Sequence, residues 1–237
     1  IPAHAVEPSP PLENVVSLIR RLGGNPLAIE LAAGLLEVMS LSDLIRRLDQ
    51  SFDVLTNPSA GASRHSALAA AIDWSWDGLD ETARAALSQA AVFSGGVPLD
   101  AAEQVIQLPA EASGSVLDAL HALARRSLLR AAPGPRFSFP LSVQEYASRK
   151  LRERGEHAET MARHASYFAE YGVAWADRMR GHDRAQGRKR LISESANLTA
   201  VVRRGLDAHL PIELSLQALY AIRGIAGESV LHAEYFL

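Results

Sequence analysis

The stretch Arg64–Gly96, RHSALAAAIDWSWDGLDETARAALSQAAVFSGG, decides the fold of this chain, and the rest is arranged around it. It predicts two helices with a tight break between them, because Gly78 is placed to end the first and Asp80 to cap the second. The residues that fall on one face of the first helix are Leu68, Ala71, Ile72, Ser75, Trp76 and Leu79.

The end of the second helix is apolar on every side, from Ala90 to Phe93. A helix end of this kind is expected to be buried and to lead into a compact domain. The Gly95-Gly96 pair that follows is expected to stop the helix, since glycine adopts backbone conformations that other residues avoid.

Composition sets the fold class. Hydrophobic residues make up 48% of the 237 residues and aromatic residues only 6%, which favours a mainly α protein. The chain has no cysteine, which excludes disulfides and thiolate zinc sites and indicates a reduced, cytoplasmic setting. No apolar run approaches the roughly 20 residues that span a bilayer, and the net charge of −3 offers no general attraction for nucleic acid or membrane lipid.

A small helical domain is expected over residues 1–60. Residues 1–11 hold four prolines and are expected to be extended. A helix should begin at Pro26, with Asn25 as its N-cap, and another at Ser40, where Asp43 completes a capping box; 57–63 read as a linker. The apolar stripe of a preceding helix, which ends at Gly23-Gly24, is expected to be Leu12, Val15, Val16, Ile19 and Leu22.

A winged-helix domain is expected over residues 64–154. After Gly96 come a short helix near 99–106 and a longer one over 115–126. The segments 127–130 and 136–139 then flank APGP, which predicts a short β-hairpin turned by its Pro-Gly pair. A second capping box, Ser142 with Glu145, is expected to open the next helix.

A helical arm is expected over residues 156–237. It reads as one long helix through Met161 and Met179, a second through Leu191 and Leu206, and a third over about 211–223. Helical hairpins that cannot bury their faces alone suggest the first repeats of a solenoid, so the chain is expected to be a fragment cut at both ends.

A family resemblance covers nearly the whole chain in consistent order. The segments that carry it are IRRLGGNPLAIELAA, LDQSFDVLT, RHSALAAAIDWSWDGLD, AVFSGGVPLDAAEQV, LHALARRSLL, VQEYASRKL, RHASYFAEY and ESANLTAVVRRGL. The chain resembles the STAND class of signalling ATPases, in particular the NB-ARC type found in bacterial transcriptional regulators of the LuxR and AfsR type. The resemblance implies a P-loop domain, a small helical domain like the first ARC domain, a winged helix and a tetratricopeptide-like arm, of which this chain holds the last three.

Nucleotide chemistry is expected outside this chain. It contains no G-x-x-x-x-G-K-[ST] motif and no strand that resembles a Walker B motif, so we expect no enzyme activity and no catalytic residues here. The resemblance implies that the full-length protein binds ATP or ADP, mostly through the P-loop domain. It also implies that Gly24, Asn25 and Pro26 form the G-x-P motif, with Pro26 packed on the adenine; the alternative is that Pro26 only starts a helix.

A second family contact is missing. The Met-His-Asp motif, whose histidine reaches bound ADP in the family, is replaced here by Pro140-Leu141-Ser142. Leucine cannot donate a hydrogen bond to a phosphate, so other groups must hold ADP if it locks the protein closed.

Three residue pairs are weaker candidates, and each has a simpler interpretation. His157 and His164 share a helical face but lack a third ligand, so no metal site is expected. Asp73 and Asp77 could be paired catalytic carboxylates, but a solvated acidic face is favoured. The other pair, Trp74 and Trp76, is expected to be largely buried rather than to stack on bases, because alternate positions on a helix point apart.

Direct DNA binding by this part is not expected. A recognition helix should carry Arg, Lys, Asn or Gln along its exposed side. The helix over 115–126 offers only Asp118, His121, Arg125 and Arg126. The basic stretch RMRGHDRAQGRKR at 178–190 has no interleaved aromatic residues and is interpreted as a solvated turn, with a nucleic-acid contact as the alternative.

Two functions remain open. The favoured one is a regulatory module, in which the arm senses a protein or small-molecule inducer and moves the winged helix, which packs on the protein's own P-loop ATPase domain. The alternative is a DNA-binding winged-helix protein with a helical dimerisation arm.

Overall fold

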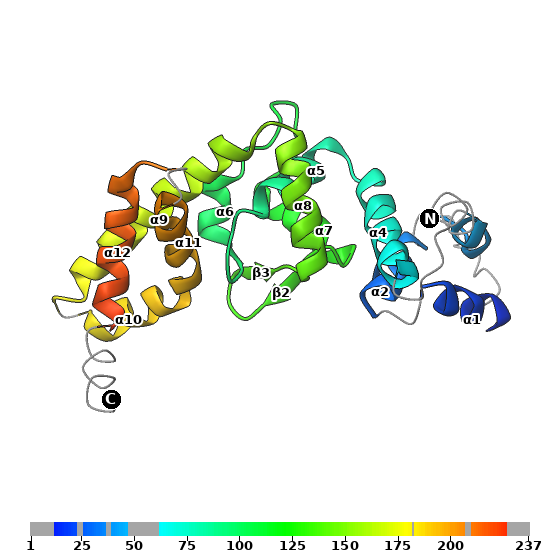
Figure 1. The fold of residues 1–237 in the computed structure, drawn as a ribbon, viewed down its shortest axis with the longest axis horizontal. Helices are drawn as coiled ribbons and strands as arrows, with labels where there is room; N and C mark the ends of the chain where they lie inside the picture. Colours follow the sequence, from blue (N-terminus) through cyan, green and yellow to red (C-terminus); the bar gives the residue numbers. More distant parts are fainter. Residues whose placement is uncertain are drawn as a thin grey trace, which may run out of the picture. The chain divides into compact units, whose positions relative to one another are not determined.

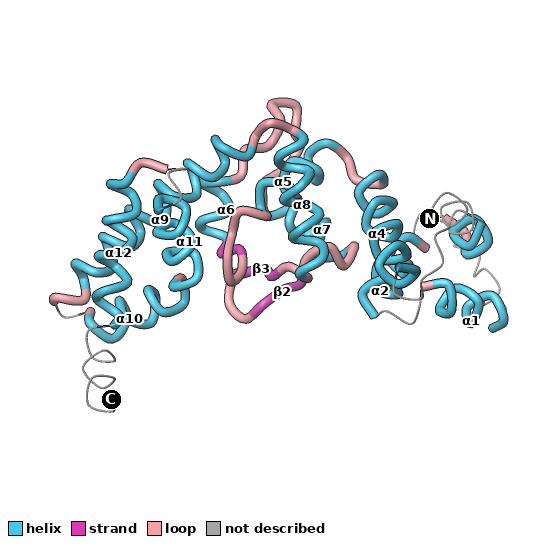
Figure 2. The backbone as a smooth tube through the Cα atoms, viewed as in Figure 1, coloured by secondary structure: helices cyan, strands magenta, loops and turns pink. Residues whose placement is uncertain are grey.

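A computed structural model describes residues 12–22, 26–36, 39–46, 62–181, 183–206 and 210–226. The described chain is mainly helical with one small three-stranded sheet, which confirms the predicted fold class (Figures 1 and 2). It divides into two compact units: one runs to Asp80 and includes Ala122–Leu129, and the other comprises Glu81–His121 and the chain from Arg130. The division at Asp80 falls inside the stretch Arg64–Gly96. The three predicted domains stay a prediction.

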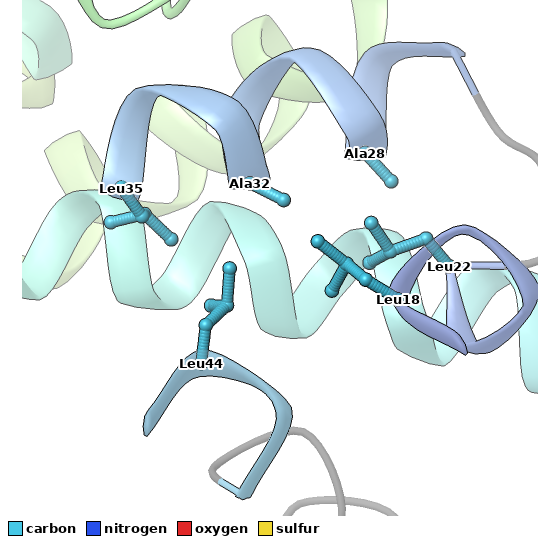
Figure 3. Close-up of a cluster of buried hydrophobic side chains, with 6 residues drawn as sticks. All are labelled: Leu18, Leu22, Ala28, Ala32, Leu35 and Leu44. Atoms are coloured by element: carbon cyan, nitrogen blue, oxygen red, sulfur yellow. The ribbon is translucent and has the colours of Figure 1, made fainter. Parts of the chain in front are cut away.

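The first unit is built around an apolar cluster. Its helices are α1 (Leu12–Arg21), α2 (Pro26–Leu35), a short helical segment at 41–46, and α4 (Ala62–Asp77), and α2 packs against α4. Trp74 of α4 is partly buried and also packs on this cluster. The buried side chains that meet in it, shown in Figure 3, are Leu18, Leu22, Ala28, Ala32, Leu35 and Leu44.

The predicted stripe of the first helix was wrong in part. Leu22 is buried, but Leu12, Val16 and Ile19 are exposed, and Leu18, which we did not assign to the stripe, is buried in their place. Leu18 and Leu22 are four residues apart and therefore lie on one face of α1. With many apolar residues in ten positions, the 3.6-residue period alone did not select between two overlapping stripes.

Several helix ends follow their predicted signals. Helix α2 begins at Pro26, and α4 ends at Asp77, immediately before Gly78. The Oγ of Ser40 accepts a hydrogen bond from the Asp43 backbone N–H (3.1 Å), as the capping box requires. The predictions for residues 1–11, for Gly23, Gly24 and Asn25, and for most of the linker (57–61) lie outside the described residues.

The second unit begins in the region predicted to be a winged helix, and we call the helices and strands of that region the winged-helix elements. They are α5 (Glu81–Ala90), β1 (Val97–Pro98), α6 (Leu99–Val105), α7 (Val116–Arg125), β2 (Arg130–Ala132), β3 (Arg136–Ser138) and α8 (Leu141–Glu153). Residues Ala122–Leu129 of this region belong to the first unit. The antiparallel sheet has the order β1-β3-β2, with Phe137 of β3 opposite both Val97 and Ala131. A hairpin is present around Gly134 as predicted, but its first strand, β2, overlaps the predicted segment 127–130 only at Arg130. The third strand, β1, was not predicted, because it is only two residues long.

Two predicted helix boundaries in this unit were wrong. Helix α5 ends at Ala90, so the Gly95-Gly96 pair does not stop it; the buried run that follows it, through Phe93, was predicted correctly. Helix α8 starts at Leu141 with Pro140 as its N-cap and no side-chain cap hydrogen bond. Ser142 therefore lies inside the helix and forms no capping box with Glu145, because Pro140 already fixes an extended residue at the helix start.

The second unit continues into four arm helices: α9 (His157–Arg178), α10 (Arg184–Ser193), α11 (Ser195–Leu206) and α12 (Ile212–Ala226). Helix α12 packs against both α9 and α11 (Figure 1). An ideal Cβ on Gly172 of α9 would lie 2.8 Å from the Cβ of Ala221, so these helices approach as closely as glycine allows. None of the described helices is long and apolar enough to cross a bilayer.

The arm differs from the prediction at two places. The second predicted helix is two helices, α10 and α11, which meet at Glu194. The basic stretch 178–190 is not simply a turn, because its second half, from Arg184, is the first part of α10. The charges of that half are therefore held on a helix surface.

Candidate functional site: a buried polar junction

The loop 91–96, which leaves α5 and enters β1, lies directly against the arm. Gly95 and Gly96 have φ angles of 73° and 112°, in the region that disfavours side chains. An ideal Cβ on Gly95 would come within 2.7 Å of the Cβ of Ala196 on α11, and one on Gly96 within 3.0 Å of the Phe137 carbonyl oxygen. The two glycines are required here for close approach to α11 and β3 rather than for ending a helix.

Asn197 of α11 is the centre of this contact, and it is fully buried. Its Oδ1 accepts hydrogen bonds from the Ser94 backbone N–H (2.7 Å) and from His164 Nε2 (3.2 Å). Its Nδ2 donates to Glu194 Oε2 (3.0 Å) and to the Gly96 carbonyl oxygen (3.4 Å). One amide therefore joins the loop backbone to α9 and to the start of α11, and its own donors and acceptor are used.

His164 of α9 is held as a neutral imidazole. Arg204 Nη1 lies 3.2 Å from His164 Nδ1, and because a guanidinium can only donate, Nδ1 is the acceptor. The ring proton is therefore on Nε2, which donates a hydrogen bond to Asn197 Oδ1. Burial, and then the charge of Arg204, lower the pKa of His164 to about 3. The ring is enclosed by Phe93 and Phe168, with centroid distances of 5.1 and 4.7 Å.

Two arginines bind the loop carbonyls from either side. Arg204 Nη2 donates to the Val92 carbonyl oxygen (2.6 Å), and Arg136 Nη1 of β3 donates to that of Gly95 (3.2 Å). Gln144 of α8 donates to the carbonyl oxygen of Phe93 (2.7 Å). Side chains thus satisfy backbone groups that no secondary structure pairs, which is the condition for burying a loop.

A buried ion pair completes the arrangement. Arg136 Nη2 donates to Glu194 Oε1, and the two side chains are only 16% and 7% exposed. Burial raises the pKa of Glu194, while the hydrogen bonds from Asn197 and Arg136 act in the opposite direction. We call the set Arg136, His164, Glu194, Asn197 and Arg204, with the loop backbone 92–96, the polar junction.

A second network lies beside the polar junction. Gln89 of α5 exchanges two hydrogen bonds of 2.8 Å with the backbone of Gln107, just after α6. Arg163 of α9 donates to Gln89 Oε1 (3.0 Å) and to the Val105 carbonyl oxygen (2.8 Å). Arg163 therefore ties α9 to the winged-helix elements, at the residue next to His164.

Among the five side chains of the polar junction, only His164 was a candidate from the sequence. His164 and His157 were weak candidates for a metal site. His164 is buried and both of its ring nitrogens make hydrogen bonds, whereas His157 is only partly buried. Where the structure is described, no group of three His, Cys, Asp or Glu side chains could hold a metal ion. A usable signal did exist: Asn197 and Arg204 fall at helical spacing beside Leu198 and Val201, as polar residues on an otherwise apolar face.

The described residues do not form a site around the predicted nucleotide contact. Pro26 is the exposed first residue of α2, and Gly24 and Asn25 lie outside the described residues. The adenine contact stays a prediction. Leu141, which replaces the family histidine, is the first residue of α8 and is 71% exposed.

The candidate recognition helix α7 uses most of its polar side chains internally. Asp118 accepts from the Ser115 backbone N–H (2.9 Å) and caps the helix start. The His121 ring packs edge-on against Phe137, at a centroid distance of 5.6 Å. Arg126, just beyond the helix, donates to the Gly78 carbonyl oxygen (2.5 Å), whereas Arg125 is exposed.

The Asp73–Asp77 and Trp74–Trp76 pairs differ in their exposure to solvent. Asp73 and Asp77 are both exposed on α4, as expected for a solvated face. Trp76 is 8% exposed, which confirms its burial, whereas Trp74 is only partly buried.

The chain is similar to part of several mycobacterial proteins. A protein of Mycobacterium tuberculosis named "Putative HTH-type transcriptional regulator" is 37% identical over 158 residues, which is 65% of this chain and 18% of that protein. A Mycobacterium bovis protein of the same description matches equally. An uncharacterized M. tuberculosis protein is 32% identical over 161 residues, 65% of this chain and 40% of its own length. No family model matches the chain, and no solved structure matches it significantly.

Proposed function

We propose that this chain is the signal-transmitting part of a transcriptional regulator, in which the arm α9–α12 passes a binding event to the winged-helix elements. The observation that carries the proposal is the polar junction: side chains of α11, themselves bonded to His164 of α9, hold the backbone of the loop that enters β1. Similarity to proteins named as HTH-type transcriptional regulators supports the regulatory role.

The physics of the junction favours transmission over independent motion. A buried hydrogen bond adds about 1 kcal/mol when made, but a buried group left without a partner costs about 1–3 kcal/mol. If α11 shifted alone, the Ser94 N–H and the Gly96 carbonyl would lose Asn197, and the Val92 carbonyl would lose Arg204. A shift of the arm is therefore cheaper when the loop and β1 follow it, which is how a packed interface conveys a displacement.

The nucleotide switch is the finer part of the proposal and depends on the family resemblance. In this proposal a P-loop domain of the full-length, cytoplasmic protein binds ATP or ADP, and Pro26 at the start of α2 packs on the adenine. Nucleotide titration of the full-length protein should show weaker binding for Pro26→Asp. Equal affinities would remove the adenine contact while leaving the junction unaffected.

A direct test of transmission uses the full chain and amide hydrogen exchange. Asn197→Ala should accelerate exchange at Ser94 and in β1 and β3, because the loop loses its anchor. Thr199→Ala is the matched control, since Thr199 is exposed two residues later and its Oγ1 bonds only to the Ser195 carbonyl of its own helix. Faster exchange confined to α11 would contradict the proposal.

The alternative is direct DNA binding by the winged-helix elements, with the arm as a dimerisation element. The names of the relatives favour DNA binding somewhere in those proteins. Against it in this part stand the internal contacts of Asp118, His121 and Arg126 around α7. A gel-shift titration at several salt concentrations distinguishes the two, because phosphate contacts weaken steeply with salt; the favoured proposal expects no shift at low salt.

A further inference from the structure

The far end of the arm carries a pocket of about 420 Å³ where the end of α9, the start of α10 and the end of α12 come together. None of the contacts of the polar junction involves it. Its main lining residues are Ala176, Met179, Arg180, Arg184, Tyr220 and Arg223. Three guanidinium groups therefore border one hollow, two from the neighbouring positions 180 and 184 and one from Arg223 of α12.

The aromatic wall of the pocket is fixed in place. The Tyr220 hydroxyl donates to Asp177 Oδ1 (2.7 Å), and the Arg180 guanidinium lies over the Tyr220 ring, 5.3 Å from its centroid. Asp177 also lies 4.0 Å from Arg180 Nη1. One carboxylate thus contacts both side chains, and the described residues that line the pocket include three arginines and no acidic side chain.

The floor of the pocket is apolar and closely packed. Ala176 is buried, and Met179 is held by the approach of α10, since an ideal Cβ on Gly187 would lie 2.6 Å from Met179 Cγ. Arg184 also lines a second hollow along α10, of about 600 Å³, together with Arg188, Lys189 and the exposed Ile192. Positive charge and apolar surface therefore continue side by side along α10.

We propose that the α9–α10–α12 pocket binds a small organic anion. A phosphate or carboxylate group would be held by Arg184 and Arg223, with Arg180 at the rim, because guanidinium groups match both anions with paired, charge-assisted hydrogen bonds. The apolar part of the molecule would lie on the Tyr220 ring and over Met179. A mixed pocket with an apolar floor fits a small molecule better than a nucleic-acid backbone, which needs only an open basic surface.

The role of this ligand as the signal of the arm rests on the proposed function, but its binding does not. Binding is measured by calorimetry on the full chain with four probes: phenyl phosphate, benzoate, inorganic phosphate and phenol. Saturable binding of phenyl phosphate or benzoate, tighter than that of inorganic phosphate, is expected, and phenol should not bind. The stronger of the first two identifies the anionic group. No saturation by any anion at millimolar concentration would overturn the proposal, whatever the hydrogen-exchange result at the polar junction.

Variants locate the site. Arg223→Gln and Arg184→Gln should each weaken binding of the better probe by about tenfold, the size expected for a hydrogen bond to a charged group. Tyr220→Leu should remove the preference over inorganic phosphate. Arg203→Gln is the control, because Arg203 is an exposed arginine on α11 that does not line the pocket. An equal loss in Arg203→Gln, or short duplex DNA that binds more tightly than the probes with the same arginine dependence, would show a general basic surface instead.

Discussion

Each of the two compact units is stabilised internally by a different kind of interaction. In the first, the buried side chains that α1, α2 and the segment at 41–46 bring together are aliphatic, and such contacts have no preferred direction. In the second, the contact between the winged-helix elements and the arm is a set of directed hydrogen bonds around Asn197. An apolar cluster loses stability gradually with volume, whereas a satisfied polar network fails as a unit when one member is removed. The second kind suits the transmission that we propose for this part.

The largest effect is expected from Asn197→Leu. This change leaves the Ser94 N–H, the Gly96 carbonyl and the Glu194 carboxylate without their buried partner, so the second unit should lose about 3–5 kcal/mol of unfolding free energy. Urea denaturation followed by circular dichroism measures the loss. Thr199→Ala should cost less than about 1 kcal/mol, and a similar cost for both variants would mean that the junction does not act as a network.

Leu22→Ala tests the apolar cluster. Removing a fully buried leucine side chain from between α1 and α2 should cost about 3 kcal/mol in the unfolding transition of the first unit. Ile19→Ala, on the same helix and 39% exposed, should cost less than about 1 kcal/mol. Comparable losses would indicate that α1 packs through the stripe that we first assigned from the sequence.

Gly95→Ala separates backbone strain from close approach. Alanine at a φ of 73° is strained by about 1 kcal/mol, and its Cβ would also meet Ala196, so a total of about 2–3 kcal/mol is expected. The control is Gly134→Ala in the hairpin turn, where φ is 81° but no atom lies within 4 Å of the new Cβ. That variant should show the strain alone, and equal thermal shifts for the two would refute the contact with α11.

The smallest effect is a pH dependence that belongs to the junction. The pKa of His164 is about 3 in the folded chain against 6.5 ordinarily, so the unfolded chain binds the proton first as the pH falls. The contribution of neutral His164 to the unfolding free energy is complete above pH 6.5 and is lost progressively as the pH falls from there towards 3.

Between pH 7 and pH 5.5 this loss amounts to about 1 kcal/mol. Urea unfolding at the two pH values should show that His164→Gln abolishes this component, whereas His157→Gln, on the same helix but only partly buried, retains it. An unchanged pH dependence in His164→Gln would mean that the histidine titrates normally.

Much of the fold could be predicted because its signals are local. Pro26 and Gly78 mark helix ends by their backbone properties alone, and Ser40 with Asp43 forms a cap within one turn. The hairpin around Gly134 follows from turn chemistry in the same way. The prediction failed where two local signals competed, as at α8, where Pro140 rather than Ser142 sets the helix start.

The polar junction could not be predicted, because its members are far apart in the sequence. Ser94 and Asn197 are 103 residues apart, so although its place on an apolar helix face marks Asn197 as buried, nothing local identifies its partners. Arg136 would have been assigned to the exposed edge of a hairpin, yet it is partly buried against Glu194. Their roles depend on which helices pack together, and the helical period does not contain that information.

The sequence by itself determined the mainly helical class, the order of elements around Arg64–Gly96 and the absence of any cysteine chemistry. Only the tertiary structure decided that Gly95 and Gly96 serve close contact with α11 and β3, and that the arginines of 180, 184 and 223 border one pocket. The physical reason is that propensity and capping act within a few residues, whereas burial, pKa and charge at a site are set by neighbours brought together from distant parts of the chain.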